Sequence, residues 1–314
     1  SARRTTKGIK DGDKMCGLVG MAGDLSYLLR TTVFKDMLDV CQTRGRDSTG
    51  VIKVNKDLDY TWVKQVGPPN ILYDSRLYDN RIDSNKEGEA CILVGHTRSK
   101  TVGDINIKNA HPFDFADEGI CGVHNGTLRF YNGLDTYDYK KVDSEVLYGH
   151  LAANGPQDTF DKLEGAFACI WWDNNTKCLN FFRNSERPLW LTWSKDLKTM
   201  FWASETWMFG SVARKCPLWD GGKEGNQFVE LPVNTLWQFE VHPKATGEEK
   251  VITMKAPRVI EPEKKSIGAG TTYRGNGSWV ETSPGVRQRV VDHSQANGGG
   301  SVPRPFAQRH PAVQ

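Results

Sequence analysis

The sequence predicts an α+β fold in which antiparallel β-sheets are covered by helices. Strand-like runs dominate the chain, several are joined by turn signals, and the helix-like runs fall between groups of strands. A length of 314 residues with 38% hydrophobic and 25% charged residues is typical of a globular protein with a sizeable core. This order of elements argues against a strictly alternating, doubly wound α/β fold.

The strand predictions depend on runs of apolar, β-branched and aromatic residues that are bounded by turn-forming residues. Two of the turns, "DNNTK" at 173–177 and "KDLK" at 195–198, predict hairpins. In chain order the predicted strands are 16–23, 48–54, 60–66, 91–98, 119–126, 165–172, 178–185, 189–194, 200–205, 234–241 and 251–256.

Two longer segments are predicted to be helices. Residues 27–42 carry apolar side chains at helical spacing. Residues 144–155 show the same pattern, with Asp143 or Ser144 near the N-cap and Gly155 near the end.

We expect one folded domain, 16–256, between a leader at 1–15 and a tail at 257–314. The tail is rich in Gly, Pro, Ser and Gln and is predicted to be disordered. Met15 stands directly before Cys16, as a natural translation start would, so the leader is expected to be untranslated or removed. If the leader were retained instead, it would block the α-amino group of Cys16.

Charge and composition exclude several function classes. The net charge of +3 conceals basic ends, because residues 1–14 carry +3 and 257–314 carry +4, which leaves −4 for 15–256. The predicted domain therefore gives no electrostatic case for nucleic-acid binding. No apolar run approaches the roughly 18 residues that span a bilayer, and the first fourteen residues lack the apolar stretch of a signal peptide. We expect no membrane association.

The seven cysteines show neither Cys-x-x-Cys pairs nor zinc-ligand spacing. Most of them lie in apolar, strand-like runs, which predicts buried, reduced thiols and a cytoplasmic protein. We expect no metal and no cofactor. Cys16 is the exception, since its position after Met15 would make it N-terminal once the methionine is removed. Its α-amino group, with a pKa of about 7.7–8.0, could then act as the base for its own thiol.

A series of motifs follows Cys16 in a fixed order. In order and spacing they closely resemble the class II glutamine amidotransferase domain, the N-terminal-nucleophile glutaminase of glucosamine-6-phosphate synthase, amidophosphoribosyltransferase and asparagine synthetase. The resemblance covers about residues 16–210. Its motifs are "CGLVG", "TRGRDSTGV", "GHTRSKTVGDINIKNAHPF", "GVHNGTL", "DSEVLYGHL", "LEGAFACIWWD" and "RPLW…FWASE".

The resemblance implies a four-layer α/β/β/α sandwich of the N-terminal-nucleophile hydrolase type, and it implies roles for individual residues. Cys16 matches the nucleophile. Asn125 and Gly126 match the oxyanion hole, which needs two fixed donors for the negative oxygen of an attacked amide. Arg98 matches the residue that binds the glutamine α-carboxylate, and Asp143 matches the carboxylate that holds the α-ammonium group.

Three further residues are matched by the resemblance with less defined roles. His111 matches a pocket histidine, Arg44 matches an arginine that lines the nucleophile, and Asp47 is expected to order the loop near Arg44. His96 and His124 are interpreted as structural, because the mechanism gives them no task.

Structural readings of the same residues stay open. Asn125-Gly126 is also the dipeptide of a type I′ turn, and Asp143 could be only a helix cap. Arg98 could be a surface arginine at a strand end, His111 a packed histidine and Arg44 an ordinary ion-pair partner.

The chain departs from the family pattern at two points. Ser99-Lys100 follows Arg98 where the amino-sugar synthases have Trp, which affects the loop beside the substrate. Arg46 stands where relatives have Tyr, Pro or Gly, and it could meet a partner or the substrate, or be solvated.

The expected function is that of a stand-alone glutaminase. It would hydrolyse glutamine to glutamate and ammonia and pass the ammonia to a separate synthase partner, because no synthase signature follows residue 256. Two alternatives are hydrolysis of another γ-glutamyl amide, and an inactive binding or regulatory module.

Overall fold

The computed structural model describes residues 15–84, 88–130, 133–138, 140–210, 215, 228–246, 249–261, 271–274 and 278–281. The predicted leader lies outside the described residues except for Met15. The chain divides into a unit that ends at Glu263 and a second unit from Lys264 onward. In the second unit, β15 (Thr271–Arg274) pairs with β16 (Ser278–Glu281), and the rest of the predicted tail lies outside the described residues.

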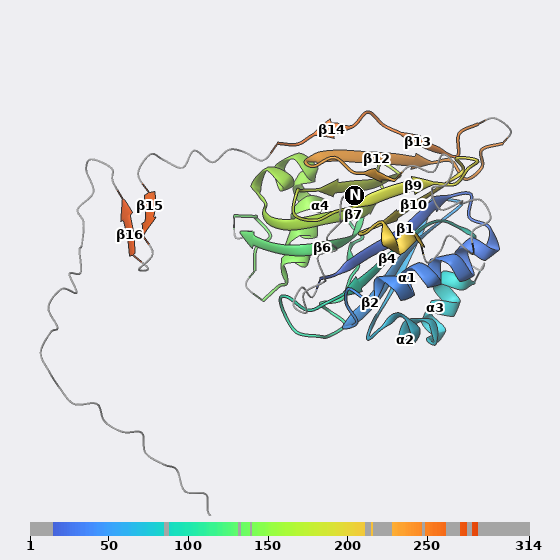
Figure 1. Ribbon diagram of the computed structural model, residues 1–314, viewed down its shortest axis with the longest axis horizontal. Coiled ribbons are helices and arrows are strands. Elements are labelled where there is room, and N and C mark those ends of the chain that lie inside the picture. The colour runs from blue at the N-terminus through green and yellow to red at the C-terminus, as the bar shows by residue number, and fades with distance from the viewer. Residues whose placement is uncertain are drawn as a thin grey trace, which may run out of the picture. The chain divides into compact units, whose positions relative to one another are not determined.

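The first unit contains two large antiparallel sheets (Figure 1). The first sheet has the strand order β11-β9-β10-β1-β4-β2-β3, so the first strand of the chain lies near its middle, hydrogen-bonded to β10 and β4. Its strands are β1 (Gly17–Gly23), β2 (Ser48–Asn55), β3 (Tyr60–Val66), β4 (Ala90–Arg98), β9 (Trp190–Trp193), β10 (Thr199–Ala203) and β11 (Val229–Glu230).

The second sheet has the order β13-β12-β8-β7-β6-β5, and β14 also pairs with β12. Both predicted hairpins are confirmed, since β7 pairs with β8 in this sheet and β9 pairs with β10 in the first sheet, each antiparallel. β6 also pairs with β7, although α4 (Asp143–Lys162) separates them in the chain. The strands are β5 (Phe113–Phe115), β6 (Ile120–Phe130), β7 (Glu164–Asp173), β8 (Cys178–Arg183), β12 (Thr235–Val241), β13 (Ile252–Met254) and β14 (Arg258–Val259).

Few helices accompany the sheets. α1 (Phe34–Cys41) continues the π-helical segment η1 (Leu29–Val33), and together they account for the predicted helix at 27–42. The sequence did not predict the short segments between β3 and β4 or the one after β10. These are α2 (Pro69–Tyr73), α3 (Arg76–Tyr78), η2 (Asp79–Asp83) and α5 (Trp207–Gly210).

The longest helical element is α4 (Asp143–Lys162), in which two helical stretches meet across a kink at Gly155, near where the sequence predicts the first helix to end. Gly155 adopts a left-handed conformation with φ of 78°, which interrupts the helix as expected. Pro156 follows immediately, and since proline is well suited to a first helical turn, the chain starts a further helical stretch there.

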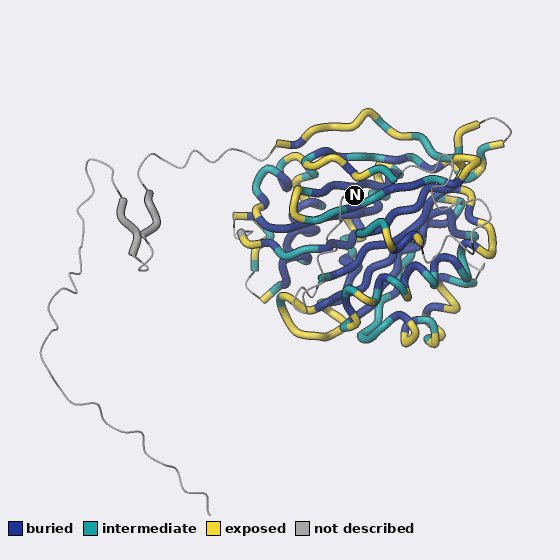
Figure 2. The backbone as a smooth tube through the Cα atoms, in the orientation of Figure 1, coloured by how far each residue is buried: buried dark blue, intermediate teal, exposed yellow. Residues whose placement is uncertain are grey.

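Three clusters of buried side chains define the packing. The buried residues, dark blue in Figure 2, follow the strands of the two sheets. Alternation along β1 supplies two of them. Val19 and Met21 pack with Phe34 of α1, whereas Leu18 faces Val123 of the second sheet. The third cluster joins the other face of the second sheet to α4. The prediction of two antiparallel sheets packed face to face is confirmed, with only a few helices covering their outer faces.

The packed unit extends a few residues past the predicted boundary at 256. β14 hydrogen-bonds to β12, and Ile260 is fully buried in the cluster under α4. None of the described helices is long and apolar enough to cross a membrane.

Candidate active site

Cys16 lies directly before β1, at one end of the space between the two sheets. The register pairs Gly17 with Thr97 and Leu18 with His96, so Cys16 stands opposite Arg98 on the neighbouring strand. Its thiol is buried and donates to the main-chain carbonyl of Ser99 at 3.5 Å. Burial raises the pKa of the thiol to about 11, although the Ser99 hydrogen bond and the Arg98 and Arg44 charges oppose this shift. The thiol is therefore protonated at neutral pH unless a base takes its proton.

Arg44 holds the main chain of the candidate nucleophile. Its Nε donates to the carbonyl oxygen of Cys16 at 2.8 Å, and its Nη2 lies 3.5 Å from the sulfur of Met15. A buried ion pair to Glu205, with Nη1 and Oε1 2.6 Å apart, fixes the guanidinium. Arg44 is thus both an ion-pair partner and a wall of the nucleophile's surroundings.

Arg98 is buried at the end of β4, which overturns the reading of a surface arginine. Its guanidinium donates to the carbonyls of Val102 at 2.5 Å and Asp104 at 3.2 Å. Two parallel donors that bind a pair of main-chain oxygens present the geometry that a carboxylate would also accept.

Asp47 ties the Arg44 loop to the end of β4. Its main-chain N–H donates to the carbonyl of Arg98 at 2.9 Å, and its carboxylate accepts the N–H of Lys100 at 2.7 Å. The expected ordering role of Asp47 therefore extends to the segment around Ser99. This segment carries the carbonyl that binds the Cys16 thiol.

Asn125 and Gly126 lie inside strand β6, paired with Ala168 and Phe167. The alternative reading of a type I′ turn is therefore wrong. A Cβ atom on Gly126 would lie 1.8 Å from the carbonyl oxygen of Ala166, so no other residue fits there. The side chain of Asn125 is fully buried, and its Oδ1 has no hydrogen-bond partner among the described residues.

Ser204 connects Asn125 to the strand that carries the nucleophile, a role that the sequence analysis missed. Its hydroxyl accepts the N–H of Leu18 at 2.9 Å and the Nδ2–H of Asn125 at 3.4 Å. Its own N–H donates to the carbonyl of Leu18 at 2.9 Å. Ser204 and Glu205 belong to the quoted motif "FWASE", which was the available signal.

Asp143 is buried at the first position of α4. Its Oδ2 accepts the N–H of Leu128, two residues after Gly126, at 3.0 Å, and its Oδ1 accepts the N–H of Ser144 at 2.9 Å. The N-cap residue is Val142, whose side chain makes no capping bond, so the carboxylate acts within the first turn. The charge of Asp143 also contributes to raising the pKa of the Cys16 thiol, after the larger effect of burial.

Three buried histidines lie next to these groups. The rings of His96 and His111 have centroids 4.0 Å apart, and those of His111 and His124 are 6.5 Å apart. His124 bonds through Nδ1 to the hydroxyl of Ser144 at 2.9 Å. His111 is thus packed against His96, and both of its ring nitrogens lack partners among the described residues.

A cleft of about 520 Å³ lies outside the nucleophile, formed mainly by the loop after α1. Arg44, Asp47 and Ser99 line it together with Arg46, for which the sequence allowed two readings. Arg46 donates to the side chain of Gln42 at 3.1 Å in an exposed position.

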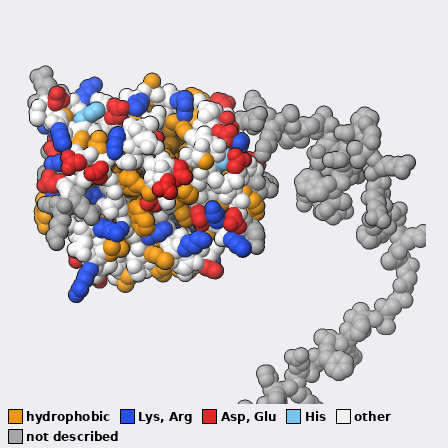
Figure 3. Space-filling model, turned by 180° about the vertical axis from the view of Figure 1, so that it is seen from behind, with side chains coloured by type: hydrophobic (Ala, Val, Ile, Leu, Met, Phe, Trp, Pro, Cys, Tyr) orange, Lys and Arg blue, Asp and Glu red, His pale blue; other side chains and the backbone are white. Residues whose placement is uncertain are grey.

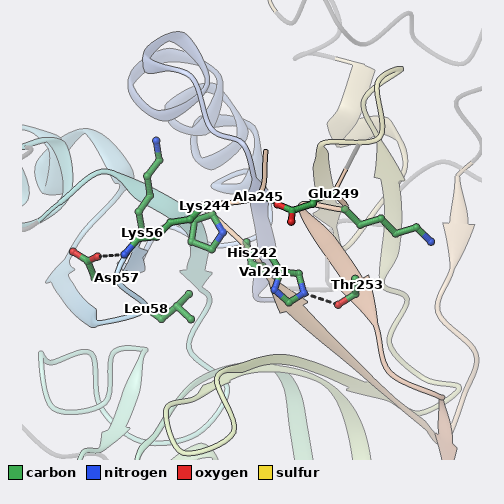
Figure 4. A pocket seen from close by; sticks show the side chains of 11 residues that line it. Lys56, Asp57, Leu58, Val241, His242, Lys244, Ala245, Glu249 and Thr253 are labelled. Atoms are coloured by element: carbon green, nitrogen blue, oxygen red, sulfur yellow. Dashed lines mark hydrogen bonds and ion pairs between the residues drawn. The ribbon is translucent and has the colours of Figure 1, made fainter. Parts of the chain in front are cut away.

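A larger cavity lies at the opposite end of the sheets, between the β2–β3 and β12–β13 turns (Figure 4). It measures about 680 Å³ and is called here the lysine-lined cavity. Its charged groups pair at the surface, since Lys244 binds Asp57 at 2.9 Å. Its lining residues are Lys56, Asp57, Leu58, Val241, His242, Pro243, Lys244, Ala245, Glu249, Lys250 and Thr253.

Metal and polyanion binding gain no support from the described residues. Within the described ranges, no group of three His, Cys, Asp or Glu side chains is placed to hold a metal ion. On the face of the molecule shown in Figure 3, acidic and basic side chains are intermixed. That face therefore presents no large field of one sign.

Comparisons with known proteins support the sequence-based assignment. A family profile described as "Glutamine amidotransferase domain" matches residues 96–210. The glutamine–fructose-6-phosphate aminotransferase (isomerizing) of Bacillus spizizenii is 31% identical over 192 residues, which are 56% of this chain and 30% of that protein. The enzyme of the same name from Bacillus licheniformis is 29% identical over 312 residues, 92% of this chain and 47% of that protein. The chain thus spans less than half the length of these curated relatives.

Solved structures support the fold. The glutamine phosphoribosylpyrophosphate amidotransferase of B. subtilis, complexed with ADP and GMP, superposes with a TM-score of 0.53 at 16% sequence identity. The match covers 76% of this chain and 49% of that one. Motifs, family profile and relatives together show that the chain carries a class II glutamine amidotransferase domain, which is related to that of glutamine–fructose-6-phosphate aminotransferase and has the fold seen in phosphoribosylpyrophosphate amidotransferase.

Proposed function

We propose that this protein hydrolyses glutamine to glutamate and ammonia through a thioester on Cys16. The observation that carries the proposal is the meeting of Cys16 with Arg98 and Asp143 at one end of the sheets, where both charges act on its thiol. An amino-acid substrate carries a carboxylate and an ammonium group, and this site offers one buried group of the opposite charge for each.

The chemistry begins with attack of the Cys16 thiolate on the side-chain amide carbon. The Asn125 amide and the Gly126 main-chain N–H stabilise the negative oxygen that forms. The carbon–nitrogen bond then breaks, the departing NH2 group takes up the proton that the base removed from the thiol and leaves as ammonia, and a γ-glutamyl thioester remains. Water attacks the thioester, which releases glutamate and restores the thiol.

The burial of the thiol makes a base necessary. In the described part of the chain the hydrogen bond of the Cys16 thiol goes to a carbonyl oxygen, and no imidazole or carboxylate bonds to it. We therefore assign the base to the α-amino group of Cys16, which becomes free when the residues up to Met15 are absent. Its ordinary pKa of about 7.7–8.0 suits proton transfer near neutral pH.

Substrate binding requires Arg98 to exchange partners. The guanidinium now binds the carbonyls of Val102 and Asp104, and a glutamine α-carboxylate is a stronger acceptor than either. We infer that the segment after Arg98 shifts when glutamine binds, which would bring Ser99 and the thiol into their reactive arrangement.

The ammonia would pass to a separate synthase partner. At neutral pH free ammonia becomes ammonium, which is a poor nucleophile, so direct transfer avoids this loss. The curated relatives are aminotransferases more than twice as long as the matched region, and the acceptor of this chain remains to be found. The six described cysteines are free thiols, and we place the reaction in a reducing compartment such as the cytoplasm.

The test is glutamate release from glutamine by a protein that begins at Cys16. We expect turnover in this form, none in its Cys16→Ala variant, and none in a form that keeps Met15 uncleaved. A substrate panel of γ-glutamyl amides identifies the preferred leaving group. Glutamine binding without turnover in the Cys16 form, with its N-terminus verified by mass spectrometry, would contradict the proposal and support a binding module.

A further inference from the structure

The buried histidines beside Arg98 carry polar atoms that the proposed mechanism does not use. Both ring nitrogens of His111 and the Nδ1 of His96 have no partner among the described residues, although both side chains are at least 97% buried. A buried nitrogen without a partner costs free energy unless a ligand or solvent molecule satisfies it. Three such atoms on two adjacent rings, tilted by 36° to each other, point to a bound molecule.

The main chain on both sides of His111 is held in place by Lys64 and by the close approach of Gly50. The ammonium of Lys64 donates to the carbonyls of Ala110 at 2.8 Å and Pro112 at 3.0 Å, on either side of His111. Gly50 of β2 lies so close that a Cβ atom there would come within 1.9 Å of the His111 carbonyl oxygen. These contacts fix the main chain, while the ring nitrogens themselves stay available.

His96 lies further along the paired strands β1 and β4 than Cys16 does, and His111 packs against it. His96 precedes Arg98 by two residues on β4, so the two side chains point to the same face about 7 Å apart. Cys16 stands opposite Arg98, and Leu18 stands opposite His96. Arg98 also acts electrostatically on both His96 and His111. His96 and His111 therefore lie next to Arg98, on the side that leads away from Cys16 along β4.

The surroundings keep both imidazoles neutral. Burial lowers the pKa of His96 to about 3 and the pKa of His111 well below its usual value, and the Arg98 charge acts in the same direction. The Nε2–H of His96 already donates to the carbonyl of His124 at 3.1 Å, so its Nδ1 is an acceptor, whereas neutral His111 offers one donor and one acceptor. Such a pair suits a small molecule that both donates and accepts, and it repels a cation less than a charged pair would.

We propose that His111 and His96 bind a small neutral nitrogen or oxygen hydride, ammonia or water, next to the Cys16 thioester. This inference rests on the proposed glutaminase function and extends it, because it assigns a place to the molecule that leaves in the first half-reaction or attacks in the second. The ammonium ion satisfies this pair less completely than ammonia does, since it has no lone pair to accept from the N–H of His111.

Hydroxylamine is a probe of the same chemistry, since it is small, neutral and nucleophilic at nitrogen. Its nitrogen attacks the thioester carbonyl carbon, the carbon–sulfur bond breaks, and the electron pair goes to the Cys16 sulfur. The sulfur takes the proton that the nitrogen loses. The products are γ-glutamyl hydroxamate and the free thiol, in competition with glutamate from water.

The experiment measures hydroxamate, glutamate and ammonia during glutamine turnover at increasing hydroxylamine concentration. Ammonia counts the acylation events, and the hydroxamate-to-glutamate ratio reports which nucleophile reaches the thioester. We expect the ratio to saturate in the wild type, which indicates a binding site. In His111→Phe, which keeps a ring but no nitrogen, we expect a linear dependence and a ratio about tenfold lower.

Further variants separate this role from a loss of folding. His111→Asn restores a donor and an acceptor and is expected to recover part of the ratio. Lys64→Met removes the hydrogen bonds to the carbonyls of Ala110 and Pro112 but leaves the His111 ring, and we expect it to lower the ratio. Lys64→Arg keeps a donor there and is expected to restore the ratio. His242→Phe, at the opposite end of the sheets, is the matched control and should leave the ratio unchanged.

The outcomes distinguish the two proposals. If the wild type releases neither ammonia nor hydroxamate, the glutaminase function itself is wrong. If it turns over glutamine with a linear, unsaturable dependence on hydroxylamine, or if His111→Phe keeps the wild-type ratio, the glutaminase stands and the histidine site is overturned.

Discussion

The two ends of the sheets show opposite relations between cavity size and chemistry. At one end, which we call the nucleophile end, Cys16, Arg98, Asn125 and Asp143 are buried and are held by hydrogen bonds to main-chain atoms or to Ser204. At the other end the lysine-lined cavity is larger than the cleft outside Cys16, but its ion pairs are exposed. Convergent, buried polar groups mark the reaction site better than open volume does.

This difference follows from what each end must hold in place. Groups that act on developing charge have to be positioned before the reaction, so their partners are buried and numerous. Surface ion pairs need no such positioning and contribute little. Substitutions at the two ends should therefore differ strongly in their effects.

The largest effect is expected at Asn125. Asn125→Ala in the form that begins at Cys16 removes one donor from the proposed oxyanion site and should lower kcat by roughly 10²- to 10³-fold. The KM for glutamine should change little, since the amide acts on the transition state. An unchanged kcat would remove Asn125 from the reaction, and a melting curve checks that the variant is folded.

The rate at which the Cys16 thiol is alkylated should be low at neutral pH, because burial raises its pKa. While Met15 precedes it, its pKa of about 11 leaves roughly 300-fold less thiolate at pH 7.5 than a free cysteine with a pKa near 8.5. Alkylation by iodoacetamide should therefore accelerate about tenfold per pH unit through pH 10, because only the deprotonated form reacts. Mass spectrometry of the Cys16 peptide measures this rate, and a midpoint near pH 8.5 would refute the expectation.

Arg98 is expected to control substrate affinity. Arg98→Ala should raise the KM for glutamine by about 10- to 100-fold, since charge-assisted hydrogen bonds to a carboxylate contribute about 1.5–3 kcal/mol. Arg98→Lys keeps the charge without the paired donors and should give an intermediate KM. Steady-state kinetics with a KM equal to that of the wild type would exclude Arg98 from carboxylate binding.

Ser204 should have a smaller effect, because it acts by positioning Asn125 and β1. Ser204→Ala loses two hydrogen bonds at 2.9 and 3.4 Å, and kcat should fall about five- to tenfold while KM stays near the wild-type value. Ser204→Thr keeps the hydroxyl and is the conservative control. A rise in the KM for glutamine with an unchanged kcat would show instead that Ser204 acts on substrate binding.

The lysine-lined cavity should tolerate substitution. Lys244→Met breaks the ion pair with Asp57, in which the Lys244 side chain is 76% exposed and the Asp57 side chain 65% exposed. The free energy of unfolding should therefore change by less than about 0.5 kcal/mol. Glutamine turnover should stay within about twofold of the wild type. Urea denaturation and steady-state kinetics measure both, and a tenfold loss of turnover would show that the two ends are linked.

Much of the fold could be read from the sequence because strand signals are local. The alternating run 48–54 predicts β2, and the turn at 173–177 predicts β7 and β8 on either side of it. All three strands lie within two residues of their predicted bounds. The segments α2, α3 and η2 were missed, since helices of three to five residues show no full period. The restart after Gly155 was missed because a single left-handed residue reads as a stop.

The site was readable only in part. Motifs indicated Cys16, Arg98 and Asn125, but the tasks of Ser204 and Lys64 arise from contacts that connect distant segments. Ser204 lies 186 residues from Leu18, and Lys64 lies 46 from Ala110, so no local pattern predicts either hydrogen bond. The burial that raises the pKa of Cys16 is likewise a property of the packed sheets.

The central place of β1 in its sheet has a consequence for the order of folding. β1 pairs with β10, so Val19 meets Ala203 only after more than 180 further residues have left the ribosome. Until then the strand lacks one of its two neighbours. The first sheet, and with it the surroundings of Cys16, is therefore completed late in synthesis.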